Sequence, residues 1–354
     1  MAETVAALYT LALQQETRLH AEMALAAALI VPPFTPKRRA LIRAGFGKVH
    51  LLHARLNETW LRQLHLPSVG GLPYFGAERV YFEQLRRRLN LWVELNGLLH
   101  KIMIAPRLPV IAALTPQISP MERQLRAFEG ALYHLHDYLS PPRPNAEDHV
   151  GKHHDIPLPF THFARLMQLA RRTALALGRT APVSFLDVGC GVGLKVLQAA
   201  QVFEIAQGLE YDNSRVVVAD KLMRNARRPD DKVFQADAIS YDGYGGFDVI
   251  YAYKPLSALD LLIQMEQGIV AQAKPGTVLV MPYTEFEERF QDMGCGRVAR
   301  LVYVTGYKDR DMKPLLRKIA RIGFIVPDDP TSRQFDEGFV APLAKALRHW
   351  GHLA

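Results

Sequence analysis

The stretch Phe185-Leu186-Asp187-Val188-Gly189-Cys190-Gly191-Val192-Gly193 decides the fold of this chain. Apolar residues around an acid lead into a G-x-G-x-G loop, and a helix-like run, Leu194 to Gln201, follows. The pattern predicts a buried strand, a tight glycine turn and the start of a helix. Glycine lets a ligand lie against the main chain, and the first N–H groups of a helix point at that ligand. We therefore expect a nucleotide-type cofactor site at this loop.

The chain after residue 182 alternates between apolar strand candidates and helical stretches. This alternation predicts an α/β fold with a doubly wound, mainly parallel sheet, in which ligands bind at the carboxyl ends of the strands. The glycine loop follows the first strand at that edge. The strand candidates are Val183–Val188, Ala206–Glu210, Val233–Ala236, Asp248–Ala252, Val278–Pro282 and Ala299–Thr305.

Residues 1–140 have the pattern of helices. Ser119-Pro120-Met121-Glu122 combines a serine cap, a proline in the first turn and a glutamate three residues after the serine, which is a capping box. A stretch rich in proline, histidine and acid follows this helix. We therefore expect an all-helical N-terminal domain over residues 1–150 and the α/β domain over residues 151–354. The apolar stripe after the capping box consists of Leu125, Phe128, Leu132, Leu135 and Leu139.

The glycine loop departs from the dinucleotide-binding pattern. That pattern is G-x-G-x-x-G/A, and its third small residue allows a helix to pack closely on a strand. Here that position holds Leu194, and the third glycine falls one place early, at Gly193. Other acids follow in register: Glu210 closes the second strand candidate, and Asp237 follows the third.

With these features the chain resembles the class I S-adenosylmethionine-dependent methyltransferases over residues 155–305. Asp187 matches the acid two residues before the family's glycine loop, and Lys274-Pro275-Gly276-Thr277 is similar to its K-P-G-G turn before the fifth strand. The resemblance implies a seven-stranded Rossmann-like sheet that ends in an antiparallel hairpin. Ala299–Thr305 suits its sixth strand, and Ile322–Val326, after a helix-like segment, is the candidate for the seventh.

The resemblance also implies how the cofactor S-adenosylmethionine is held. Asp187 would bind its methionine end, Glu210 its ribose hydroxyls, and Asp237 its adenine amino group, with the Ala238 N–H on a ring nitrogen. A carboxylate at a strand end can accept two hydrogen bonds from ribose hydroxyls. Asp212 is the alternative to Glu210. The implied cofactor-binding set is Asp187, Gly189, Cys190, Gly191, Gly193, Glu210, Tyr211, Asp237, Ala238 and Tyr251.

The residues that act on the methyl acceptor are less defined. The fourth motif, Tyr251-Ala252-Tyr253-Lys254-Pro255, lacks the first polar residue and first proline found in the family's DNA amino-methyltransferases. Tyr251 or Tyr253 could form an aromatic wall for an amine, because a cation is attracted to a ring face. His154 and Asp155 are candidate general bases. The histidines and acids around residues 134–155 show no standard metal-ligand spacing, so we expect no metal site and favour a surface loop there.

Composition limits the cellular setting. The chain has a net charge of +8 and only two cysteines, Cys190 and Cys295, so we expect a reducing, cytoplasmic compartment. Its longest apolar run near the N-terminus, Met23 to Val31, is too short to span a bilayer, and we expect no membrane association.

Three functions remain open. The favoured one is methyl transfer to a protein side chain or a small molecule, and the pattern loosely resembles the histone-lysine methyltransferases of the Dot1 type. The second is an RNA methyltransferase, a less favoured hypothesis, in which Lys37-Arg38-Arg39 and Arg86-Arg87-Arg88 contact phosphates. The third is a scaffold that keeps the cofactor fold without catalysis.

Overall fold

The computed structural model describes residues 4–32, 34–65, 76–104, 120–139, 158–180, 182–226, 232–322, 325, 335 and 337–353. The chain divides into two compact units. The helical unit comprises Met1–Pro106 together with Asp329–Leu353, and the sheet unit comprises Arg107–Asp328. Each unit is described by itself below.

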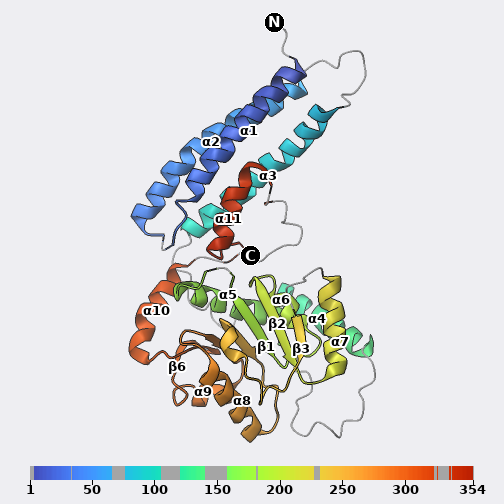
Figure 1. The fold of residues 1–354 in the computed structure, drawn as a ribbon, viewed down its shortest axis with the longest axis vertical. Helices are drawn as coiled ribbons and strands as arrows, with labels where there is room; N and C mark the ends of the chain where they lie inside the picture. Colours follow the sequence, from blue (N-terminus) through green and yellow to red (C-terminus); the bar gives the residue numbers. More distant parts are fainter. Residues whose placement is uncertain are drawn as a thin grey trace. The chain divides into compact units, whose positions relative to one another are not determined.

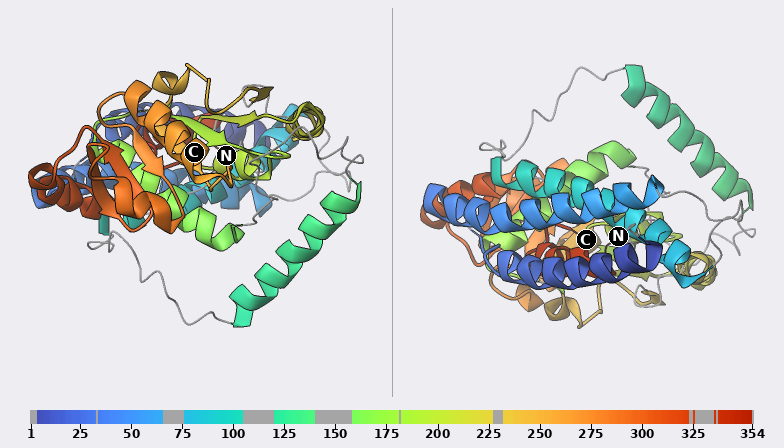
Figure 2. Two further views of the ribbon diagram at one scale, coloured as in Figure 1. Left: turned by 90° about the horizontal axis from the view of Figure 1, so that it is seen from below. Right: turned by 90° about the horizontal axis from the view of Figure 1, so that it is seen from above.

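The helical unit consists of three long helices and a short C-terminal segment. Helices α1 and α2 run side by side along their length, as Figures 1 and 2 both show. Thr4 and Thr35 begin these two helices, because each hydroxyl accepts a hydrogen bond from the N–H three residues later. The helices are α1 (Val5–Ala27), α2 (Pro36–Leu64), α3 (Ala77–Ile104), the 3₁₀ turn η5 (Gly338–Val340) and α11 (Ala341–His349).

Apolar residues spaced three and four apart build the core of the helical unit. An apolar stripe on α3 is buried in full. It consists of Leu85, Leu89, Trp92, Leu99 and Ile102. The half-buried ion pair between Arg88 and Glu16, with Nε 2.6 Å from Oε1, joins α3 to α1. The Tyr81 hydroxyl donates to the same carboxylate at 2.9 Å.

The sheet unit contains a seven-stranded sheet in the order β3-β2-β1-β4-β5-β7-β6 (Figure 1). The first five strands pair in parallel, and β7 pairs antiparallel with both β5 and β6. The predicted doubly wound, mainly parallel sheet is thus present as a mixed sheet. The strands are β1 (Ser184–Val188), β2 (Ile205–Glu210), β3 (Lys232–Gln235), β4 (Val249–Ala252), β5 (Val278–Val280), β6 (Cys295–Ala299) and β7 (Val302–Thr305).

Helices cover both faces of this sheet. Side chains alternate between the faces along each strand, so Phe185 and Leu186 of β1 enter different apolar clusters. Helices α5, α6, α7 and α10 pack on the face of Phe185, and α8 and α9 pack on the face of Leu186. The helices are α5 (Phe160–Ala176), α6 (Leu194–Ala199), α7 (Asn213–Asn225), α8 (Leu259–Gln272), α9 (Thr284–Arg289) and α10 (Asp309–Arg321), with the 3₁₀ turn η3 (Tyr244–Gly246).

The placement of the last two strands corrects the sequence analysis. The stretch predicted as strand six alone, Ala299–Thr305, holds the end of β6, a turn and all of β7. Leu301 in this turn has a φ of 73°, yet its side chain is buried in the core. Ile325, which was expected in strand seven, lies in no strand, and its N–H and C=O bond to the side chain of Gln168.

Helix α4 (Pro120–Leu139) belongs to the sheet unit, although the sequence analysis placed the domain boundary after it, at residue 150. Its polar side contacts the rest of the unit: Glu129 is buried, and the ring of Tyr133 lies 6.1 Å from that of Phe160. The apolar stripe faces outward instead, with Leu125, Phe128, Leu132 and Leu135 exposed. A carboxylate that finds buried donors therefore sets the orientation of this helix, and the apolar pattern does not.

None of the described helices is long and apolar enough to cross a membrane.

A buried ion pair fixes α5 to the amino ends of β1 and β2. The Arg171 side chain is fully buried, and its guanidinium donates to both oxygens of Glu204, at 2.9 and 2.6 Å. Glu204 also accepts the Val183 N–H at 2.8 Å, directly before β1. The pair therefore positions the helix that covers the strand leading into the glycine loop.

Replacing Arg171 with methionine removes the charge and keeps an apolar stem against Phe203, over which the guanidinium lies at 5.9 Å. Breaking a buried pair by removing one partner costs about 3–5 kcal/mol, and the partial exposure of Glu204 places the expected loss near the lower end. Urea unfolding of the two chains measures it.

The matched control is Arg224→Met, which breaks the exposed pair with Asp220 in the same unit and should leave the unfolding free energy nearly unchanged. Equal losses in the two variants would show that the Arg171 pair contributes no more than a surface contact.

Candidate functional site

The loop between β1 and α6 has the conformation that its glycines permit. Gly189, Gly191 and Gly193 have φ angles of 77°, 57° and 80°. This left-handed region is open to glycine and costly for most other residues. The Gly189 and Cys190 N–H groups both donate to the Leu209 carbonyl, at 2.8 and 3.0 Å. The loop is therefore bonded to the end of β2.

Neighbouring side chains crowd two of the loop glycines. A Cβ on Gly189 would lie 2.6 Å from the Cβ of Pro255, in the segment after β4. A Cβ on Gly193 would lie 3.1 Å from the Met223 side chain. On the adjacent strand, a Cβ on Gly208 would lie 2.5 Å from the Cys190 Sγ. The buried side chain of Cys190 thus packs against β2, and Cys190 contributes only its backbone to the open side of the loop.

Glu210 is the acid that faces the glycine loop. Its Oε2 accepts the Gly191 N–H at 2.8 Å, its Oε1 accepts the Asp212 N–H at 3.0 Å, and the residue is buried. Asp212 caps α7 through Ser214, at 2.9 Å, and Tyr211 between them is exposed. Of the two acids considered for the ribose, Glu210 lies at the loop and Asp212 serves a helix start.

Asp237 and Ala238 follow β3 at the same edge of the sheet. Asp237 is exposed, and its Oδ1 accepts the Ile239 N–H at 2.9 Å. The Ala238 carbonyl accepts the hydroxyl of the buried Tyr244 at 2.7 Å. Acids thus stand at or just after the ends of three adjacent parallel strands, β1, β2 and β3, where ligands bind in sheets of this kind.

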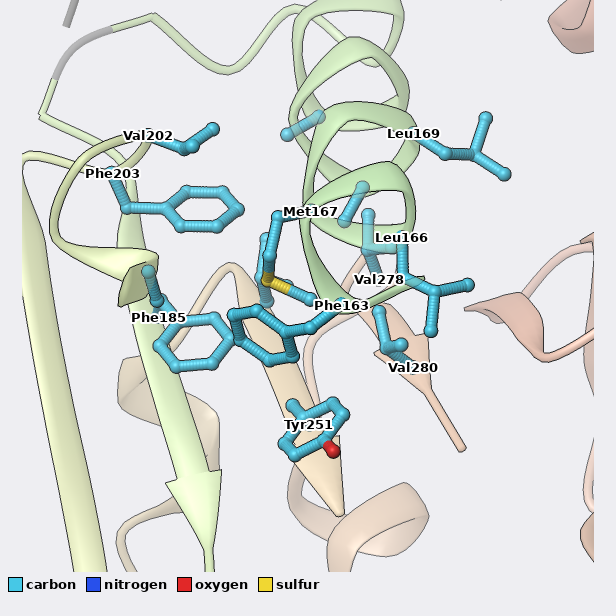
Figure 3. Close-up of a cluster of buried hydrophobic side chains, with 14 of the residues drawn as sticks. Phe163, Leu166, Met167, Leu169, Phe185, Val202, Phe203, Tyr251, Val278 and Val280 are labelled. Atoms are coloured by element: carbon cyan, nitrogen blue, oxygen red, sulfur yellow. The ribbon is translucent and has the colours of Figure 1, made fainter. Parts of the chain in front are cut away.

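The two tyrosines of the fourth motif have different surroundings. Tyr251 is buried in the apolar cluster under α5, with its ring 5.0 Å from Phe163 and 6.4 Å from Phe185 (Figure 3). Burial, reinforced by Asp187, raises the pKa of Tyr251 well above its ordinary value. Tyr253 follows the end of β4 and is half-buried, so it has the more accessible ring.

Lys254 adds a strained position beside these tyrosines. Its φ of 44° is unusual for a residue with a side chain, and such strain occurs at functional sites when the surroundings hold it. The Lys254 ammonium pairs with Glu285 at the start of α9, and this hydrogen bond lowers the pKa of the Glu285 carboxyl. The ion pair thus fixes the segment that carries Pro255 against Gly189.

The structure also places Lys195, which the sequence analysis did not consider, next to the loop. Lys195 is the second residue of α6, and its side chain is only 10% exposed. The Nζ lies 3.6 Å from Oε1 of Glu129. Burial lowers the pKa of Lys195 to about 8, although the charges of Glu129 and Asp187 oppose this shift. The only sequence signal was a lysine at a helix position among apolar residues.

His154 and Asp155, the candidate bases, lie outside the described residues, as does most of the histidine-rich connector. Within the described ranges, no group of three or more histidine, cysteine or acidic side chains could hold a metal ion.

No protein-family model and no curated protein sequence matches this chain. Solved structures match over part of it. YcgJ from Bacillus subtilis is 13% identical with a TM-score of 0.30, and the match covers 36% of this chain and 68% of that one. CalS10, an S-adenosylmethionine-bound amino pentose methyltransferase from Micromonospora echinaspora, is 22% identical with a TM-score of 0.27, over 37% and 58%. PKMT2 from Rickettsia typhi, in complex with AdoHcy, is 18% identical with a TM-score of 0.27, over 31% and 23%. This chain thus spans less than two thirds of CalS10 and about a quarter of PKMT2.

Gly208→Ala should destabilise the sheet unit, because the new methyl group meets Cys190 and Val196 in a strand–helix contact. Overpacking of this kind costs about 1–3 kcal/mol, measured by urea unfolding. Gly268→Ala in α8 is the control, since a Cβ there meets nothing within 4 Å and alanine favours a helix. A Gly208→Ala chain as stable as the control would contradict the close contact.

The lowered pKa of Lys195 should appear in the pH dependence of stability. Between pH 8 and 10.5 the native lysine has lost its proton and the unfolded lysine keeps it, so the native state gains stability as the pH rises. From pH 7 to 10 the wild-type chain should gain about 2–3 kcal/mol relative to Lys195→Met. Urea unfolding of both chains across this range tests it, because every other titration is shared. A constant difference would show that Lys195 titrates at its ordinary pKa.

Proposed function

We propose that the sheet unit is an S-adenosylmethionine-dependent methyltransferase that acts on a protein side chain or a small molecule. One observation carries the proposal. The glycine loop, with three left-handed glycines, is bonded through Gly191 to the carboxylate of Glu210. It lies at the carboxyl end of β1, between β2 and β4, where the strand order of a doubly wound sheet reverses and ligands bind.

The residues at this edge fit the cofactor. Glu210 would accept the ribose hydroxyls, Asp237 the adenine amino group, and Asp187 the ammonium of the methionine end. Asp187 and Glu210 are buried, and a buried carboxylate gains from a cationic partner. The three left-handed glycines support this assignment, because a loop without side chains leaves the backbone open to the ligand.

The bound cofactor would supply a methyl group already activated by its attachment to a sulfonium. The residues of this chain would fix the donor and acceptor in line and exclude water. Such orientation can contribute about 7–11 kcal/mol. The half-buried ring of Tyr253 would border the acceptor, and Pro255 closes the loop from the side of β4.

The hypothesis of an RNA acceptor has less support in the helical unit. Arg88 is engaged in the half-buried pair with Glu16, and Arg86 lies over the Trp60 ring at 5.6 Å. Arg39 donates to the Met103 carbonyl at 3.1 Å. Arginines that hold helices together are poor candidates for phosphate contacts. In our proposal the helical unit selects a protein or small-molecule acceptor.

Isothermal titration of the full chain with S-adenosylhomocysteine tests the cofactor assignment. The wild type should bind, and Glu210→Gln should bind about 10- to 100-fold more weakly, since hydrogen bonds to charged groups contribute about 1.5–3 kcal/mol.

Asp212→Asn is the matched control, because asparagine still caps α7 and the backbone N–H that bonds to Glu210 is kept. It should bind as the wild type does. A wild-type chain that binds no S-adenosylhomocysteine would refute the proposed function and favour the non-catalytic scaffold.

A further inference from the structure

Lys195 presents a buried amine that pairs with Glu129 but makes no hydrogen bond to the described residues. No hydrogen-bond acceptor among the described residues reaches its Nζ, and the closest carboxylate oxygen, on Glu129, is 3.6 Å away. A buried charge is costly unless it is paired and hydrogen-bonded. A lysine at this position therefore needs an anion in addition to Glu129.

Glu129 is already bound to another donor. Both of its oxygens accept the Phe160 N–H at 2.8 Å, the first N–H of α5. Pro159, which precedes this helix, makes no side-chain cap, so Glu129 of α4 caps α5 from a distance in sequence. Its carboxylate is thus placed by the helix start, and it stands beside the lysine without completing the coordination of the ammonium.

Two aromatic rings face the Lys195 ammonium. The Nζ lies 4.1 Å from the ring centroid of Phe160 and 5.2 Å from that of Phe163. A cation over an aromatic face is stabilised by the ring, more so when water is excluded. Figure 3 shows Phe163 and Tyr251 side by side on this face of the sheet. Asp187, beside Tyr251 in the paired strand, is close enough for its charge to act on Lys195.

We propose that Lys195 binds the carboxylate of the amino-acid end of the methyl donor, next to Asp187, which receives the ammonium of the same end. This inference rests on the proposed function and names the residue that reads one end of the cofactor. An amino-acid end carries one positive and one negative group on adjacent atoms. The site offers the complementary pair, a buried carboxylate and a buried ammonium, on the first strand and on the helix that follows the loop.

Charge balance supports the assignment. Asp187, Glu129 and Lys195 together carry one net negative charge in a place where all three are buried. S-adenosylmethionine carries a sulfonium, an ammonium and a carboxylate, so its net charge is one positive. The bound donor would neutralise the buried group, and Lys195 would gain a hydrogen-bond acceptor that none of the described residues supplies.

The test uses four ligands: S-adenosylmethionine and three relatives that differ from it at the sulfur or in the amino-acid end. S-adenosylhomocysteine has the whole end, decarboxylated S-adenosylmethionine lacks only the carboxylate, and 5′-methylthioadenosine lacks the end entirely. Calorimetric titrations compare the wild-type chain with Lys195→Met, which keeps an unbranched side chain of similar length and removes its charge. Lys195→Met should weaken S-adenosylhomocysteine about 10- to 100-fold and leave 5′-methylthioadenosine within about 3-fold.

Decarboxylated S-adenosylmethionine gives the sharper comparison, because S-adenosylmethionine differs from it by the carboxylate alone. The wild type should prefer S-adenosylmethionine about 10-fold or more, and Lys195→Met should lose this preference. Glu129→Gln is the matched control. It removes the neighbouring charge and keeps Lys195, so the preference for the carboxylate should remain.

The outcomes separate the two proposals. A wild-type chain that binds none of these ligands refutes the proposed function itself. A wild type that binds all four, with Lys195→Met weakening all alike or none, refutes the role of Lys195 and leaves the proposed function standing. If Glu129→Gln loses the preference for S-adenosylmethionine over its decarboxylated form as Lys195→Met does, the lysine acts only by holding α4. That result would also refute the role of Lys195 in binding the carboxylate.

Discussion

The site depends on three hydrogen bonds that tie the glycine loop to the end of β2. Two N–H groups of the loop share the Leu209 carbonyl, and the Gly191 N–H is held by Glu210. These bonds require a backbone course that only left-handed glycines follow without strain. The loop, the acid that faces it and the direction of α6 are therefore set together. Strand order and helix packing serve mainly to hold β1 and β2 side by side.

The strands of the sheet could be predicted from local sequence patterns. Five of the six strand candidates coincide with strands to within two residues at each end, because buried parallel strands are short apolar runs between breakers. The glycine loop could also be predicted, because closely spaced glycines after a strand are typical of a tight turn with positive φ angles. The acids at the strand ends could be placed by counting along the chain. Their contacts, such as the Glu210 bond to Gly191, could not.

The misplaced elements depend on distant contacts. The turn between β6 and β7 carries Arg300-Leu301 and no glycine, proline or asparagine, because burial of the Leu301 side chain offsets its positive φ. Helix α4 is oriented by one glutamate that meets an N–H and a lysine from other elements, and its apolar periodicity is overruled. In the sequence Lys195 is indistinguishable from an ordinary helix residue, because its burial also depends on contacts with other elements. The spacing of apolar residues predicts which face of a helix or strand is apolar. It does not predict which polar side chain is buried.

The contact between Pro255 and Gly189 has a consequence for how two ligands share this site. The segment after β4, which would border the acceptor, rests directly on the loop that would hold the donor, with no room for even one further methyl group between them. A ligand that shifts either segment must shift the other or strain the contact. The occupancies of the two sides are then thermodynamically linked, and each ligand changes the affinity of the other by the same factor. A single van der Waals contact between a proline and a glycine would thus couple the two affinities.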